Sequence, residues 1–94
     1  MNIINLLNPG ENMIINPNDF ATNIPYVHSV LKSDQDRGVS IHDTASLISA
    51  SIGIPIIATY SIMALQLGMT PEIIRTLDNL KAFYHVDEVI AWKN

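Results

Sequence analysis

The sequence predicts an all-α fold, a small bundle of four to five helices. Apolar residues recur at helical spacing in successive segments, which is the main sequence signal for amphipathic helices. Proline, glycine, serine and threonine separate these segments at positions typical of helix ends. The chain has 94 residues, too few to divide into two cores. We therefore expect an N-terminal arm, residues 1–22, followed by a single helical domain, residues 23–94.

The predicted arm is rich in asparagine and is irregular or hairpin-like. The sequence Asn8-Pro9-Gly10 separates two short apolar runs, "IINLL" and "MII", and is typical of a turn. Because a lone two-stranded hairpin is only marginally stable in water, we expect the arm to pack on another surface. That surface can be its own domain, a second copy after domain swapping, or a different partner.

The first two helices follow the arm. Asn23 is placed to cap a helix whose first turn contains Pro25, and Arg37-Gly38 is a suitable end. The second helix is predicted to begin after Ser40 and to end at Gly53. Each has an apolar stripe at helical spacing. The first consists of Ile24, Val27, His28 and Leu31, and the second of Ile41, Ala45, Ile48 and Ile52.

The third and fourth helices differ in how their apolar residues are distributed. Residues 55–67 are apolar nearly all round the predicted helix, and a helix of that kind is buried on all sides. Gly68 ends it, and Thr70-Pro71-Glu72 marks the next start. The fourth helix is amphipathic, and a last short helix is expected from about Asp87. The fourth helix's stripe is Ile73, Leu77, Leu80 and Tyr84.

A charge-free run from Thr44 to Pro71 is long enough to cross a bilayer. Gly53, Pro55 and Gly68 interrupt it, and no basic cluster flanks it to set an orientation. Two helices of a soluble core, joined at a corner, explain these residues better. We therefore expect no membrane partner.

The corner between the third and fourth helices resembles the helix-turn-helix of DNA-binding proteins. Ala64, Gly68 and Ile74 match its small residue, turn glycine and apolar residue, with support from Met63, Leu67, Met69 and Leu77. The resemblance implies that the helix from Pro71 enters the major groove. The candidate partner- or DNA-facing residues on this helix are Thr70, Glu72, Arg75, Thr76, Asn79 and Lys81.

The charge balance argues against nucleic acid. The net charge is −4 and the chain has only five basic residues, whereas affinity for nucleic acid depends on neutralising phosphates. Charged residues make up 15% of the chain, so we expect part of the surface to be covered by a partner. The all-round apolar helix supplies a candidate apolar interface at Ala58, Ile62 and Leu65.

Sequence motifs for catalysis or metal binding are not found. The chain has no cysteine, its three histidines lack ligand spacing, and no phosphate-binding loop or nucleophile elbow is present. We expect no catalytic residue, no metal and no cofactor. The absence of cysteine fits a cytoplasmic protein.

Together these patterns predict a non-enzymatic protein-interaction module, such as an adaptor, an inhibitor or an assembly component. Its partner would be another protein or a second copy, as a homodimer or a higher oligomer. The alternative is a helix-turn-helix DNA-binding transcription regulator.

Overall fold

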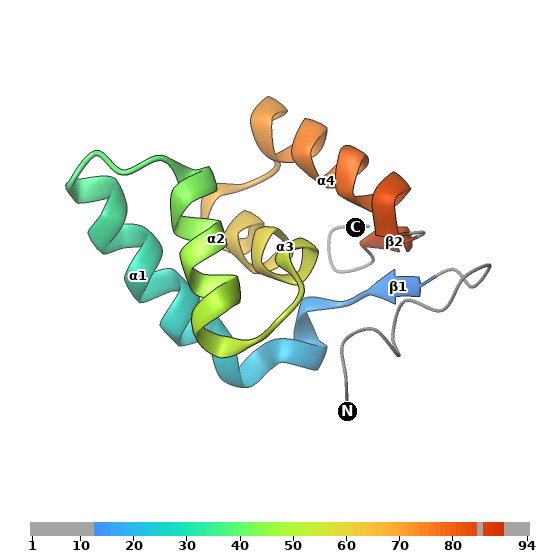
Figure 1. Ribbon diagram of the computed structural model, residues 1–94, viewed down its shortest axis with the longest axis horizontal. Coiled ribbons are helices and arrows are strands. Elements are labelled where there is room, and N and C mark those ends of the chain that lie inside the picture. Colours follow the sequence, from blue (N-terminus) through green and yellow to red (C-terminus); the bar gives the residue numbers. More distant parts are fainter. Residues whose placement is uncertain (1–12, 85, 90–94) are drawn as a thin grey trace.

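The computed structural model describes residues 13–84 and 86–89 (Figure 1). Helices dominate this part of the chain, as the apolar periodicity predicts, and two short strands accompany them. The elements in order are β1 (Met13–Ile15), the 3₁₀ helix η2 (Pro17–Asn23), α1 (Ile24–Asp36), α2 (Ile41–Ile52), α3 (Ile56–Leu67), α4 (Pro71–Tyr84) and β2 (Val86–Val89).

The centre of the bundle is α3. It packs against α1, α2, α4 and η2, and α1 and α2 lie side by side next to it (Figure 1). Every residue from Ile57 to Ala64 is buried, so the prediction of a helix covered on all sides is confirmed for this part of α3, whereas Leu65 and Gln66 in its last turn are exposed. The predicted stripes of the other helices also reach the core, through Val27 and Leu31, Ala45 and Ile48, and Ile73 and Leu77.

Two helix starts are capped as predicted. The Ser40 hydroxyl oxygen accepts a hydrogen bond of 3.2 Å from the Asp43 N–H at the start of α2. The Thr70 hydroxyl oxygen accepts one of 3.2 Å from the Ile73 N–H at the start of α4. Each cap satisfies a backbone donor that has no partner inside its helix.

The cap predicted at Asn23 is wrong. Asn23 precedes α1, but its side chain makes no capping hydrogen bond. The reason is that η2 runs directly into α1, so Asn23 has a helical backbone (φ −94°, ψ −10°) where a capping residue is normally extended. The extended backbone occurs at Asn16 instead, whose Oδ1 accepts from the Asn18 N–H at 3.0 Å.

The short helix predicted from about Asp87 is also wrong over the residues described. Val86–Val89 forms β2, which pairs in parallel with β1 and is bulged between Met13 and Ile14. A helix of so few residues is costly to nucleate, and pairing with the distant Met13–Ile15 segment gives the backbone another set of hydrogen bonds. The hairpin predicted around Asn8-Pro9-Gly10 lies outside the described residues.

The charge-free run does not form one helix. It is divided between α2 and α3, with Gly53 and Gly68 ending those two helices at positive φ. Among residues 13–84 and 86–89, no helix has both the length and the apolar character to cross a bilayer.

Candidate interaction surface

The six residues predicted to face a partner or DNA lie on α4 and on the residue before it. Thr70, Glu72, Arg75 and Asn79 are exposed, and Thr76 and Lys81 are half-buried. Thr70 caps the helix, and the Thr76 hydroxyl donates to the Glu72 carbonyl oxygen at 2.8 Å. Both hydroxyls are therefore already engaged in hydrogen bonds with the backbone of α4.

Charges of opposite sign alternate along α4. Glu72, Arg75, Asp78 and Lys81 follow one another at intervals of three residues. The Lys81 ammonium lies 3.2 Å from Asp78 Oδ1, which is an ion pair between neighbouring turns. The four charges cancel, so α4 has no positive excess to attract phosphates.

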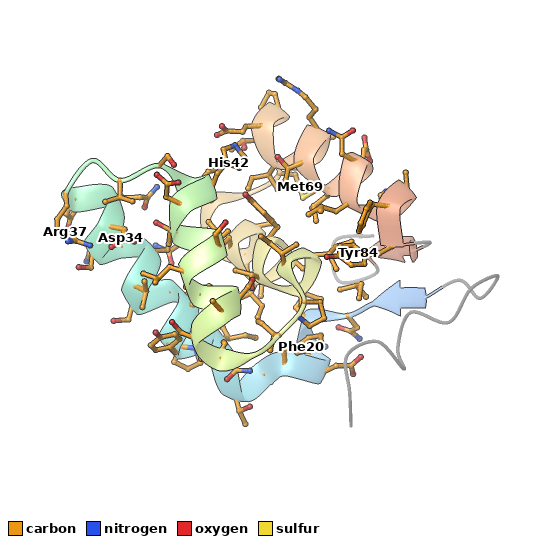
Figure 2. The ribbon with its side chains drawn as sticks, viewed as in Figure 1. Phe20, Asp34, Arg37, His42, Met69 and Tyr84 are labelled. Atoms are coloured by element: carbon orange, nitrogen blue, oxygen red, sulfur yellow. The ribbon has the colours of Figure 1, made fainter. Side chains whose placement is uncertain are left out.

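Three large apolar side chains are exposed around the α3–α4 corner. Leu65 lies in the last turn of α3, Met69 in the link and Ile74 in the first turn of α4, and each is 42% exposed. Figure 2 shows Met69 between the two helices. We call these three residues the corner surface. The other large apolar residues exposed in the described chain are Tyr26, Leu47 and Phe83.

The apolar interface predicted at Ala58, Ile62 and Leu65 is mostly inside the molecule. Ala58 and Ile62 have no exposed surface, because the surrounding elements of the same chain cover α3. They are core residues and present nothing to a partner. Leu65 lies in the last turn of α3, where the surrounding elements no longer bury the helix, and its side chain is exposed to a partner.

A hydrogen-bonded chain of three side chains joins α2, α3 and α4. His42 Nδ1 lies 2.5 Å from the Tyr60 hydroxyl, and His42 Nε2 lies 3.1 Å from Glu72 Oε2. Figure 2 places His42 at the start of α2, on the side facing α4. With a neutral imidazole, Tyr60 donates to Nδ1 and the Nε2–H donates to the carboxylate, so both ring nitrogens and the Tyr60 hydroxyl have a partner.

The surroundings of Tyr60 favour the neutral form of its hydroxyl. Burial raises the pKa of the Tyr60 hydroxyl above its usual range, and the negative charges of Glu72 and Asp43 raise it further. A hydroxyl with a raised pKa is a poor nucleophile, because nucleophilic activation requires a base or a lowered pKa. The arrangement thus suits a structural link between three helices.

A second polar cluster connects α1 with α2. The Thr44 hydroxyl donates to Asp34 Oδ2 at 2.8 Å, and the Arg37 guanidinium pairs with Asp34 Oδ1. Figure 2 shows Asp34 and Arg37 at the end of α1. The hydrogen bond from Arg37, followed by that from Thr44, lowers the pKa of the Asp34 carboxyl.

The contacts by which these two clusters join different helices could not be found from local spacing in the sequence. His42 is 18 residues from Tyr60 and 30 from Glu72, and Thr44 is ten from Asp34. The one available signal was the occurrence of polar residues, Tyr60 among them, in segments predicted to be buried. Such residues need hydrogen-bond partners, although the sequence does not say which.

The described residues contain no group of three or more histidine or acidic side chains that could hold a metal ion. His28 Nε2 is buried and has no hydrogen-bond partner within the described part of the chain. His85 and Trp92 lie outside the described residues. Comparisons with protein-family models, with curated proteins and with solved structures find no match.

Proposed function

We propose that this chain is a non-enzymatic protein-interaction module that associates with itself through the corner surface. The observation that carries the proposal is the exposure of Leu65, Met69 and Ile74 within one ten-residue segment. Single exposed apolar residues are ordinary, but several together on one feature are characteristic of a contact site. Methionine suits such a site, because its unbranched side chain adapts to different partner surfaces.

The surroundings of the corner surface favour a protein partner. No charged residue occurs between Asp43 and Glu72, so Leu65 and Met69 lie in a charge-free part of the sequence, which suits contact with another apolar surface. The tertiary hydrogen bonds of His42 and Asp34 connect helices of the same chain, which fits structural roles for these polar groups. An adaptor, an inhibitor and an assembly component, each acting in the cytoplasm, are all consistent with such a surface.

Light scattering and sedimentation over a range of protein concentrations test the proposal. We expect a mass above the 10.4 kDa of one chain, and a shift towards the single-chain mass for Leu65→Glu. The substitution places a charge where apolar area would be buried, which is costly in the complex and cheap on the exposed monomer surface.

The matched control is Leu47→Glu, which introduces the same charge at an exposed leucine of α2. It should leave the mass unchanged. A wild-type chain of single-chain mass at all concentrations would overturn the proposal, and so would an equal effect of Leu47→Glu.

A second candidate is a helix-turn-helix DNA-binding regulator. The specific support is the three-residue link between α3 and α4, together with the exposed Arg75 and Asn79 on α4. These side chains are able to read the edges of guanine and adenine respectively. The balanced charges of α4 and the absence of any basic residue on α3 oppose this function.

Fluorescence anisotropy with a labelled random duplex at low salt decides between the two functions. Non-specific DNA binders engage duplexes at micromolar protein under these conditions. An increase in anisotropy that Arg75→Ala removes would support the DNA-binding function. An unchanged anisotropy at that concentration would exclude it.

A further inference from the structure

The outward side of α4 carries a stripe that is complementary to itself. Pro71, Arg75, Asp78 and Ala82 are all exposed and follow one another at intervals of four, three and four residues. At about 100° per residue, these intervals keep the four side chains on one side of a helix. That side faces away from the buried Ile73 and Leu77. We call these four residues the outer stripe.

We propose that the outer stripe binds the same stripe of a second copy, with the two α4 helices antiparallel. In this antiparallel pair, Pro71 of one copy lies opposite Ala82 of the other copy, and Arg75 lies opposite Asp78. A two-fold axis then repeats both contacts, as an interface between identical surfaces requires. Across the dimer, the two stripes together form two ion pairs and two apolar contacts, and no charge faces a like charge.

The charges select one register. Sliding the partner helix by three residues in one direction places Arg75 opposite Arg75, and in the other direction Asp78 opposite Asp78. Both alternatives bring like charges together, which is unfavourable across an interface. Glu72 and Lys81 lie about 90° to either side of the outer stripe, so they take no part in these pairs. Glu72 already bonds to His42, so the two central pairs carry the complementarity.

The central side chains are able to form these pairs. Within the described residues, the Arg75 guanidinium forms no hydrogen bond or ion pair, and its planar fork suits a carboxylate. Asp78 forms an ion pair with the Lys81 ammonium through Oδ1, and its second carboxylate oxygen and further lone pairs are left for another donor.

This inference rests on the proposed self-association and assigns it a geometry. Ile74 lies on α4 beside the outer stripe, so the stripe is continuous with the corner surface. Apolar contact by the corner surface would supply binding energy, while the ion pairs would fix the direction and register of the helices.

A charge-reversal experiment with mixing tests the pairing. Arg75→Glu and Asp78→Arg are made in separate full-length chains, and sedimentation equilibrium measures association of each chain alone and of an equimolar mixture. In a homodimer of either variant, two pairs of like charges face each other across the interface. In a mixed dimer, Glu at position 75 faces Arg at position 78, and the unchanged Asp78 faces the unchanged Arg75.

We expect the dimer dissociation constant of each variant alone to rise about 30-fold, since two attractive pairs become two repulsive pairs at an accessible interface. The mixture should return towards the wild-type constant. Recovery on mixing cannot come from a damaged helix, because both chains keep their substitutions. Circular dichroism of each variant confirms that it is folded.

The matched control reverses one basic and one acidic residue on exposed positions of α1, as Lys32→Glu and Asp36→Arg. Neither control alone, nor their mixture, should change association. The pairing is overturned if Arg75→Glu and Asp78→Arg dimerise as the wild type does, or if mixing restores nothing. If Leu65→Glu abolishes association and the α4 reversals do not, the proposed function stands and this geometry is wrong.

Discussion

The four polar residues that are buried in the described core are each matched to a specific partner. Asp34, Thr44, Thr59 and Ser61 are buried. Thr44 binds Asp34, the Thr59 hydroxyl lies 2.7 Å from that of Ser49, and Ser61 donates to the Ile57 carbonyl oxygen. A buried polar group without a partner costs more free energy than its hydrogen bond contributes. Removing one partner at a time is therefore an informative test of these contacts.

The Asp34 cluster predicts a loss of stability in acid. Since hydrogen bonds from Arg37 and Thr44 lower the Asp34 pKa in the folded chain, the unfolded chain binds the proton first. The stability from this cluster is full above the ordinary aspartate pKa, roughly 3.9, and is lost as the pH falls through the lower folded value. Thr44→Val keeps the shape of the side chain and removes one of these hydrogen bonds.

Urea unfolding between acidic and neutral pH measures this effect. The free energy of unfolding of Thr44→Val should be lower than that of the wild type throughout. It should also fall less steeply below roughly pH 4, because the Asp34 pKa is less depressed in the variant. Parallel curves for the two proteins would show that the Thr44 hydrogen bond has no part in the acid response.

Tyr60 predicts a corresponding effect in alkali. Burial, Glu72 and Asp43 raise its pKa above 10.0, so the folded chain keeps the proton after the unfolded chain has lost it. This contribution to stability is full below 10.0 and is lost as the pH rises through the folded pKa. The difference in phenolate absorbance between the wild type and Tyr60→Phe isolates this residue. Its midpoint should lie above 10.0 while circular dichroism shows folded protein, and a midpoint below 10.0 would contradict the structure.

At the scale of the elements, glycine ends both α2 and α3, but in different backbone conformations. Gly53 is left-handed helical (φ 70°, ψ 33°), whereas Gly68 has φ 80° and ψ 177°. Other residues enter the first conformation at moderate cost, and only glycine adopts the second readily. A Cβ atom at either position would meet nothing within 4 Å, so backbone strain alone decides the effect of a substitution.

Replacing each glycine by alanine should therefore give unequal losses of stability. Gly53→Ala should cost about 1 kcal/mol, the usual penalty for a left-handed residue. Gly68→Ala should cost more, up to about 3 kcal/mol, because its conformation is less accessible. Urea unfolding of the two variants at one pH measures both losses. Equal losses would mean that the α3–α4 link relaxes to another conformation.

The helices were predictable because their signals are local, and the remaining features were not. The stripe of Ile73 and Leu77 and the cap at Thr70 depend on residues within a turn or two. The pairing of β1 with β2 joins opposite ends of the described chain, and His42 meets partners on two other helices. The error at Ala58 and Ile62 has the same origin. An apolar residue is recognisable in the sequence, but whether its own chain covers it depends on the fold.

At the scale of the whole molecule, the central position of α3 gives different roles to apolar residues that look alike in the sequence. Some stabilise the fold of one chain, and others are exposed to a partner. Ile62 is fully buried among the other elements, and Leu65, three residues later, is 42% exposed. Burial in the monomer stabilises the fold, whereas an exposed apolar side chain contributes chiefly when a partner covers it. The two residues should therefore respond differently to the same truncation.

Ile62→Ala should lower the free energy of unfolding by about 2–5 kcal/mol, because it leaves a cavity in a packed core. Leu65→Ala should lower it by less than about 1 kcal/mol at concentrations where the chain is monomeric. Under the proposed self-association, the order is reversed for the dimer dissociation constant, which should increase for Leu65→Ala and stay near wild type for folded Ile62→Ala. Urea unfolding and sedimentation equilibrium of both variants measure the two quantities independently. A large loss of stability for Leu65→Ala in the monomer would place Leu65 in the core and remove it from the corner surface.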